Sequence, residues 1–199
     1  KPPVKFASSS AAQSPAQSSS PRRLHRFREV FAGRAQLSQA FGILQNWDVD
    51  TPVELVAAAG VGLSQDLTKR GPQERLLDAA RRARRSYWHF GTTCASFCRL
   101  FQNLNNGTRS SLCPWGLAPG PKEKDGNALA RLTARTCRLL QDLGQHWSVE
   151  NPTTSFLWSL PPFRRLKRRP GVYTVRFCQC MYGLKIDGDS AHFCQKDTT

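Results

Sequence analysis

From Phe27 onward, the chain alternates short apolar runs with longer segments of helical periodicity. The runs FREVFAG, SYWHFG and HWSVENP each predict a strand that stops at a glycine or a proline. Between them, QERLLDAARRARR and NALARLTARTCRLLQDLG place apolar residues on one side of a helix and polar residues on the other. Strands that alternate with helices are typical of a parallel sheet covered by helices. The alternation therefore predicts an α/β fold and excludes a β-sandwich.

The remaining segments fit the same pattern. AQLSQAFGIL predicts a helix that buries Leu37, Ala40, Phe41 and Leu44, and a further strand is expected near WDVDTPVEL. TSFLWSLPPFRRLKRR predicts helical pieces interrupted by two prolines, GVYTVRFCQCMYG predicts a buried strand, and residues 99–126 predict a long loop.

Length and composition suggest one folded unit with two tails. A chain of 199 residues can bury one core, and we expect this domain at residues 27–183. Residues 1–26 are rich in Ser, Pro, Ala and Gln, which predicts a disordered tail or linker. Residues 184–199 are expected to be a C-terminal tail, with the chain being either a fragment of a longer polyprotein or a degenerate relative of a complete enzyme.

The charge of the chain points to a polyanionic partner. Lys and Arg number 29 against 14 Asp and Glu, a formal net charge of +15, and the arginines cluster in two blocks. The second block supplies our candidate nucleic-acid contacts, which are Arg164, Arg165, Lys167, Arg168 and Arg169. Two other interpretations remain open for these blocks: a solvated helix face, or a localisation signal that would direct the protein to the nucleus.

The seven cysteines form an odd set without a regular disulfide framework, and no N-terminal apolar segment indicates secretion. A reduced, intracellular protein is the simpler interpretation. No apolar run is long enough to cross a bilayer, so no membrane is expected. A zinc site is the less favoured alternative, because the pairs Cys94/Cys98 and Cys178/Cys180 do not have Cys-x-x-Cys spacing. We therefore expect no metal.

Distinctive groups stand at four expected strand ends. They are Phe31-Ala32-Gly33, Glu54, Gly91-Thr92-Thr93-Cys94 and Glu150-Asn151-Pro152. In an open parallel sheet, ligands bind outside the carboxyl ends of the strands, so we expect these groups to converge on one crevice.

The order FAGRA, GTTCASF and VENP resembles the catalytic domain of the DNA (cytosine-5) methyltransferases, over roughly Phe27 to Gly183. The resemblance implies a Rossmann-like, open, mostly parallel sheet with helices on both faces, S-adenosylmethionine as cofactor, and cytosine in DNA as substrate. Three positions depart from the family's pattern: Ala35 replaces a glycine, Thr93 a proline and Pro152 a valine. The segments ENP, SFLW and QCMYG are also similar to methyltransferase-like reading frames of protist mobile elements.

The resemblance assigns catalytic roles to Cys94, Glu150 and Asn151. A thiolate is among the few side-chain nucleophiles able to add to the sixth carbon of cytosine, which is the role implied for Cys94. Glu150 would stabilise the charge that develops on the ring, and Asn151 would shape the turn. The alternative for Cys94 is a buried structural thiol.

The resemblance also implies a cofactor site made by Phe31, Gly33, Glu54 and Asp66. Gly33 would let the first turn approach the ligand closely, with Phe31 packed beside it. Glu54, or alternatively Asp50, would accept hydrogen bonds from the ribose hydroxyls, and Asp66 would reach the adenine amino group. The second hypothesis for the whole chain is an inactive methyltransferase-like module that binds nucleic acid or a protein partner. His89 is interpreted as a core histidine.

Overall fold

The computed structural model describes residues 25–55, 63–182 and 197–199. The expected tails at 1–26 and 184–199 fall almost entirely outside these residues. A parallel sheet of six strands runs in the order β4-β3-β1-β5-β6, and β2 also pairs with β1. These strands are β1 (His25–Val30), β2 (Trp47–Val49), β3 (Val53–Glu54), β4 (Leu63–Ser64), β5 (Ser86–Phe90) and β6 (His146–Val149). A short antiparallel pair is formed by β7 (Phe177–Cys178) and β8 (Asp197–Thr198).

The strand order matches the first five strand positions of a Rossmann sheet. β2 and β3 lie on the same side of β1, because β2 pairs with its first half (His25 with Trp47) and β3 with its end (Val30 with Val53). If these two pieces are counted as one strand position, the order becomes third, second, first, fourth and fifth. The fold is therefore α/β and Rossmann-like.

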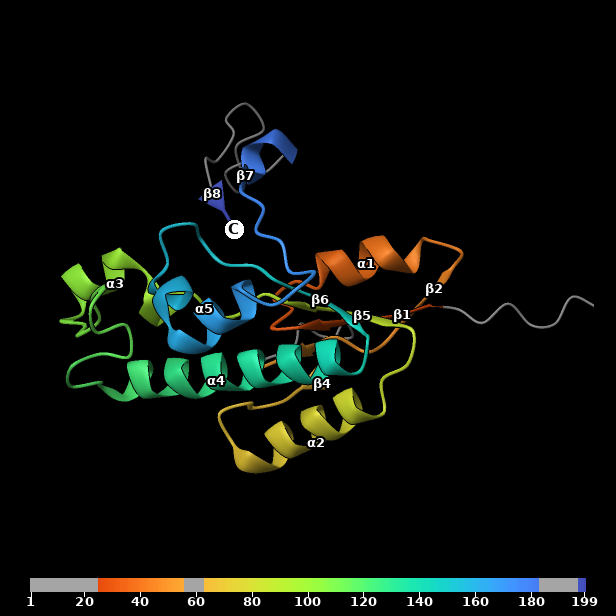
Figure 1. Ribbon diagram of the computed structural model, residues 1–199, viewed down its shortest axis with the longest axis horizontal. Helices are drawn as coiled ribbons and strands as arrows, with labels where there is room; N and C mark the ends of the chain where they lie inside the picture. The colour runs from red at the N-terminus through yellow and green to blue at the C-terminus, as the bar shows by residue number, and fades with distance from the viewer. Residues whose placement is uncertain (1–24, 56–62, 183–196) are drawn as a thin grey trace, which may run out of the picture.

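Helices cover both faces of the sheet. The α-helices are α1 (Gln36–Gly42), α2 (Arg70–Arg81), α3 (Arg99–Leu104), α4 (Pro121–Asp142) and α5 (Pro161–Lys167), and the 3₁₀ helices are η1 (Ala95–Phe97), η2 (Phe156–Ser159) and η3 (Gln179–Tyr182). Figure 1 shows α1 above the sheet and α2 and α4 below it. α4 contacts α2, α5, η1 and β6, so this helix organises the lower layer.

The core lies between the sheet and the lower helical layer. In β5, Ser86, Trp88 and Phe90 are buried, whereas Tyr87 and His89 on the opposite face are only partly buried, as the two-residue period of a strand requires. The largest apolar side chains that are fully buried in this core are Trp88, Phe90, Phe97, Leu77, Leu140, Leu157, Leu160 and Val30. This packing holds the sheet against α2 and α4. Side chains at the strand ends remain available to contact a ligand.

α1 is held to the sheet by a buried carboxylate. Glu29 of β1 accepts hydrogen bonds from the backbone N–H of Ser38 (2.7 Å) and from its hydroxyl (2.5 Å). The N-cap residue Ala35 has no side chain able to do this, so Glu29 satisfies an N–H at the start of the helix. The predicted apolar face is largely wrong, because Ala40 and Leu44 are exposed; Phe41 does pack, stacking on Phe27.

Two other sequence predictions are wrong in detail. The long loop expected at 99–126 contains α3 and the start of α4. α4 begins early because Pro121 suits the first turn of a helix and Glu123 accepts the N–H of Gly120 (3.3 Å). The buried strand expected at GVYTVRFCQCMYG is not formed: Tyr173 is 87% exposed, and the regular elements described in this segment are the two-residue strand β7 and the 3₁₀ helix η3. No helix among the described residues is long and apolar enough to span a membrane.

Candidate functional site

The loop after β1 adopts an unusual backbone. Phe31, Gly33 and Ala35 have φ angles of 60°, 52° and 52°, in the left-handed region that residues with a side chain rarely occupy. Each non-glycine residue held there costs of order 1 kcal/mol, and such costs gather at binding and catalytic sites. Five residues therefore contain three left-handed positions at the edge of the sheet where Rossmann-like folds bind ligands.

The ends of β1 and β5 approach each other closely beside this loop. The N–H of Gly91 donates to the carbonyl of Val30 (3.0 Å). A Cβ atom placed on Gly91 would lie 2.9 Å from the backbone oxygen of Phe31, closer than real Cβ atoms come. Glycine at this position lets the loop that carries Cys94 lie directly against the loop that carries Gly33.

Glu54 binds the first loop from the end of β3. One carboxylate oxygen accepts the N–H of Gly33 (2.8 Å), and the other accepts the N–H of Leu55 (2.7 Å). The alternative acidic residue, Asp50, is engaged elsewhere, because it pairs with Arg26 and with Arg28 (2.9 Å). Of the two candidates, Glu54 is the one that faces the strand-end crevice.

Asp66 lies between β4 and α2. One of its oxygens accepts both the N–H (2.9 Å) and the hydroxyl (2.5 Å) of Thr68. The Thr68 side chain, followed by the Thr68 backbone, lowers the pKa of Asp66. Asp66 is therefore a carboxylate with one oxygen used to form the turn before α2.

Cys94 directly precedes η1 and is partly buried. The segment that follows it is fixed by Arg109, whose side chain is fully buried. Arg109 donates to the carbonyl of Ser96 (2.8 Å) and lies over the ring of Phe97, 4.0 Å from its centroid. Arg109 therefore holds Ser96 and Phe97 of η1 in place.

Glu123 of α4 provides the countercharge of Arg109, with 3.7 Å between Nε of Arg109 and Oε1 of Glu123. Burial lowers the pKa of Arg109 to about 10, against the opposing effect of Glu123. Burial raises the pKa of Glu123, but hydrogen bonds from Thr108 and Gly120, together with Arg109, lower it overall. This pair was not predicted from the sequence, since Arg109 stands in a segment expected to be a loop.

Glu150 follows β6, and its N–H donates to the carbonyl of Phe90 (2.9 Å), so it continues the sheet. Asn151 is fully buried and does not line the crevice. Its side-chain nitrogen donates to the carbonyl of Thr92, and its backbone pairs with Thr199 in both directions (3.0 Å each). Asn151 thus ties the Cys94 loop to the end of β6, which is a positioning role.

These strand ends converge on one cavity of about 440 Å³. The predicted residues that line it are Phe31, Gly33, Glu54, Asp66, Cys94 and Glu150. Its size falls in the range of small-molecule sites, about 300 to 1,000 Å³. We name this space the strand-end cavity.

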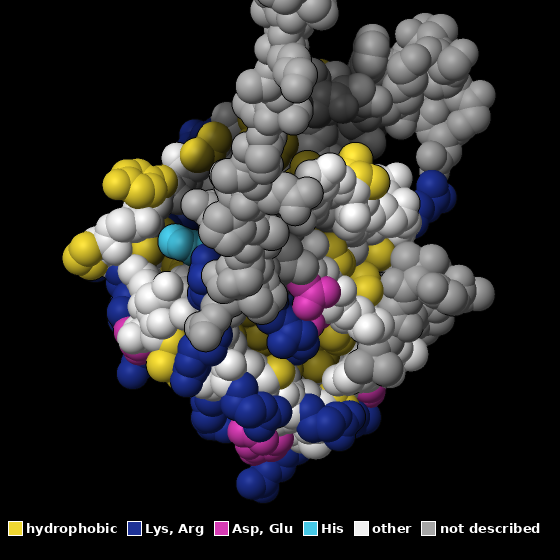
Figure 2. Space-filling view, turned by 90° about the vertical axis from the view of Figure 1, so that its right-hand side faces the viewer, with side chains coloured by type: hydrophobic (Ala, Val, Ile, Leu, Met, Phe, Trp, Pro, Cys, Tyr) yellow, Lys and Arg dark blue, Asp and Glu magenta, His cyan; other side chains and the backbone are white. Residues whose placement is uncertain are grey.

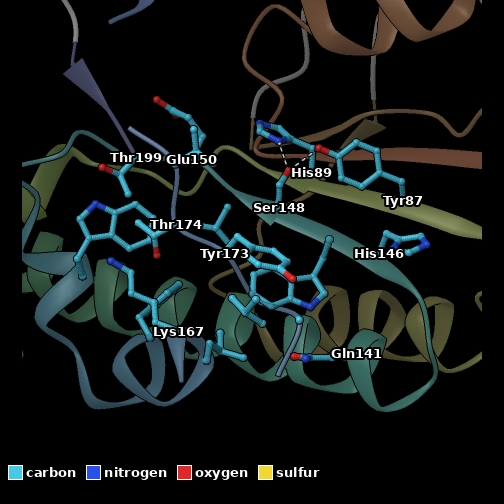
Figure 3. Close-up of a pocket in the computed structure, with 18 of the residues that line it drawn as sticks. Tyr87, His89, Gln141, His146, Ser148, Glu150, Lys167, Tyr173, Thr174 and Thr199 are labelled. Carbon is cyan, nitrogen blue, oxygen red and sulfur yellow. Dashed lines mark hydrogen bonds between the residues drawn. The ribbon is translucent and has the colours of Figure 1, made fainter. Parts of the chain in front are cut away.

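A second cavity of about 670 Å³ adjoins it, and Glu150 lines both. Figure 3 shows the polar centre of this cavity, where Ser148 lies between His89 and Tyr87. The Ser148 hydroxyl is 2.8 Å from Nδ1 of His89 and 2.7 Å from the Tyr87 hydroxyl. Burial lowers the pKa of His89, and Glu150 partly opposes this effect. The alternation of β5 and β6 placed these side chains on one face, but their contact could not be inferred from sequence.

The basic block at the end of α5 is divided between two faces. Arg165 and Arg169 face a groove shared with α2 and α4. Lys167 faces the second cavity, with its ammonium 4.4 Å from the centroid of the Trp158 ring. Arg164 and Arg168 are exposed. The block is therefore not a single surface.

No group of three or more His, Cys, Asp or Glu residues able to hold a metal ion occurs within the part of the chain that the structure describes. Comparison of the chain with protein-family models, curated proteins and solved structures finds no match. The function must therefore be argued from the geometry of these sites.

Proposed function

We propose that the chain transfers a methyl group from S-adenosylmethionine to cytosine in DNA. The observation that carries this proposal is the convergence of Gly33, Glu54, Cys94 and Glu150 on the strand-end cavity. Such a reaction needs a nucleophile and a carboxyl group. Both lie here next to the left-handed loop after β1. The proposal rests on that geometry and on the resemblance of the motifs.

The cavity fits the cofactor that the resemblance implies. Each oxygen of Glu54 accepts one backbone N–H, and a carboxylate oxygen can accept a second hydrogen bond. Glu54 therefore retains capacity for the two hydroxyls of a ribose. The second oxygen of Asp66, 3.9 Å from Nζ of Lys69, can accept a hydrogen bond from an exocyclic amino group. Phe31 and Leu129 offer apolar contact in the same space. When bound, the cofactor supplies an electrophilic methyl group.

Cys94 and Glu150 would act on the pyrimidine ring. The Cys94 thiolate adds to the sixth carbon while Glu150 binds the ring nitrogen opposite, and the displaced electron pair makes the fifth carbon nucleophilic. After that carbon takes the methyl group, it loses its proton to solvent and the Cys94 thiolate leaves as the double bond re-forms. Arg109 and Asn151 are positioning residues for this step, because each binds the segment around Cys94.

One observation favours the second candidate, an inactive module that retains the fold within a larger protein. Ala35 stands where the resemblance expects glycine, and its methyl group is buried at a left-handed φ of 52°. Glycine would adopt this conformation without strain, so the chain lacks the residue that the resemblance expects for close approach of the backbone to a cofactor.

Calorimetric titration with S-adenosylhomocysteine tests the cofactor half of the proposal. We expect micromolar binding that is lost in Gly33→Trp, because the indole would enter the strand-end cavity, and retained in Ile43→Trp, where the side chain is 82% exposed. Absence of binding to the unmodified chain would contradict the proposal.

Transfer of a labelled methyl group to duplex DNA tests the chemistry. We expect Cys94→Ser to abolish transfer without loss of S-adenosylhomocysteine binding. Cys113→Ser, a change at a partly buried cysteine outside the strand-end cavity, should retain transfer. Cofactor binding without any methyl transfer would favour the inactive module.

A further inference from the structure

A groove lined by six arginines runs between α2, α4 and α5. It encloses about 630 Å³. The arginines that line it are Arg81 from α2, Arg131, Arg135 and Arg138 from α4, and Arg165 and Arg169 from the end of α5. Figure 2 shows basic side chains gathered on the lower part of the face toward which α2 and α4 end. This arginine groove shares no lining residue with the strand-end cavity.

Three of the six arginines of the groove form ion pairs, Arg138 and Arg169 with Asp142 and Arg81 with Asp78, so two carboxylates stand against six guanidinium groups. Asp142 is the acidic residue that lines the groove, and it pairs with Arg138 at 3.7 Å. Arg135 and Arg165 are exposed and form no ion pair or hydrogen bond with any described side chain. In addition, Nε of Arg169 is buried without an acceptor among the described residues. The guanidinium groups of Arg135 and Arg165 are therefore available to donate hydrogen bonds to a bound anion.

The spacing of the arginines suits a repeating anion. Arg131, Arg135 and Arg138 recur at intervals of four and three residues, so they share one face of α4 and span about 10 Å of its axis. Duplex DNA carries a phosphate about every 3.4 Å along each strand. Four successive phosphates of one strand span about 10 Å of the duplex axis and so match the length of this row. An arginine guanidinium binds two phosphate oxygens at once.

The other lining residues argue for contact with the backbone rather than the bases. Besides the arginines and Asp142, the groove is lined by Leu77, Ala134, Leu139, Pro162 and Leu166, which neither donate nor accept hydrogen bonds through their side chains. Reading of base edges uses acceptors and amides as well as arginine. Because Asp142 is engaged by Arg138 and Arg169, arginines are the polar groups left to contact a ligand, and they distinguish its charge and spacing but not its base sequence.

We propose that the arginine groove binds the phosphodiester backbone of a nucleic acid, independently of base sequence. The proposal rests on the proposed function in taking a nucleic acid as the partner, but it does not depend on methyl transfer. The groove lies on the helical layer, whereas Cys94 lies at the strand ends. The groove would hold the nucleic acid while a separate part of it reaches the strand-end cavity.

The test compares two double variants that remove equal charge. Arg135→Gln with Arg165→Gln alters the groove at side chains that hold no other described residue. Arg70→Gln with Arg75→Gln alters two arginines of α2 that do not line it. The probe is a fluorescein-labelled, mixed-sequence DNA duplex of about 20 base pairs, whose affinity is measured by anisotropy over a range of NaCl concentrations. Binding of S-adenosylhomocysteine is measured on the same samples.

We expect the groove variant to raise the Kd at least about tenfold, and to reduce the slope of log K against log salt by about 2 units, because two phosphate contacts are lost. The α2 variant should change neither quantity to that extent. Equal weakening by both variants, or an unchanged Kd in the groove variant, would overturn the proposal. Displacement of the duplex by poly-glutamate of equal charge would also overturn it, in favour of an acidic protein partner. Cofactor binding should be equal in all samples, so failure of the groove is distinguishable from failure of the strand-end cavity.

Discussion

At the scale of residues, the hydroxyl of Ser148 joins two side chains from the neighbouring strand. A neutral His89 that accepts at Nδ1 allows Tyr87 to donate to Ser148 and Ser148 to donate to His89. The hydroxyl protons of Tyr87 and Ser148 are then both donated in hydrogen bonds. Charging His89 would convert the acceptor into a donor and would place a cation among partly buried groups.

This arrangement predicts a pH dependence of stability. Burial lowers the pKa of His89 in the folded state, so the unfolded chain binds the proton more readily. The contribution of His89 to stability is present above the unfolded pKa of about 6.5 and is lost as the pH falls from there toward the folded pKa. Urea unfolding measured between about pH 5 and pH 7.5 checks the direction.

The matched comparison uses two histidine variants. His89→Gln should have a flatter pH profile than the unmodified chain over this range. His146→Gln alters an exposed histidine of β6 and should leave the profile as it was. A profile that is identical in the His89 variant and the unmodified chain would show that the proton is bound equally in both states.

At the scale of elements, the loop between α3 and α4 is organised by an ion pair rather than by an apolar core. Arg109 donates to the carbonyls of Ser96, Pro114 and Glu123 and to the side chain of Asn127, at 2.7 to 2.9 Å. Gly126 makes room for this packing, because a Cβ atom there would lie 2.3 Å from the Ser96 hydroxyl. The element after Cys94, the long loop and α4 are therefore one cooperative unit.

Removal of Arg109 should be strongly destabilising. Arg109→Met would leave Glu123 and several carbonyls buried without their donor, for which we expect a loss of about 3 to 5 kcal/mol in the free energy of unfolding. Arg70→Met, at the exposed ion pair with Glu74, should cost no more than about 0.5 kcal/mol. Denaturant unfolding of both variants checks the difference, and similar values would mean that Arg109 does not hold this unit together.

Over the whole molecule, positive charge exceeds negative charge and is unevenly distributed. The formal net charge is +15, and six arginines share one groove. Repulsion between like charges destabilises a compact state, and salt screens it over a distance of about 10 Å at 0.1 M. The ion pairs of Asp50 and Asp142 act in the opposite direction, but they are few beside the excess of cations.

We therefore expect the melting temperature to rise as NaCl is increased from about 20 mM to about 200 mM, because screening relieves more repulsion than attraction. The rise should be smaller in the double variant Arg135→Gln with Arg165→Gln, which lowers the charge of the groove by two. Differential scanning calorimetry at constant pH measures both effects. A melting temperature that falls with salt would indicate that the surface ion pairs dominate.

Much of the fold was predictable because it follows from local periodicity. The two-residue alternation of SYWHFG and the apolar faces of α2 and α4 depend on residues near one another in the chain, and these elements formed as expected. The glycines and acidic groups at the strand ends were also recognisable, since the carboxyl ends of parallel strands lie at one edge. The α/β class and most residues of the strand-end cavity were therefore predictable from the sequence alone.

The contacts between residues far apart in the sequence depend on the three-dimensional packing. This packing selected Glu54 over Asp50, placed Asn151 beside the cavity, and buried Arg109 against Glu123. It also gathered arginines from three helices into one groove and separated Lys167 from them. Contacts of this kind join segments tens of residues apart, and they depend on the packing of α4 between the sheet and its neighbouring helices, which no local pattern encodes.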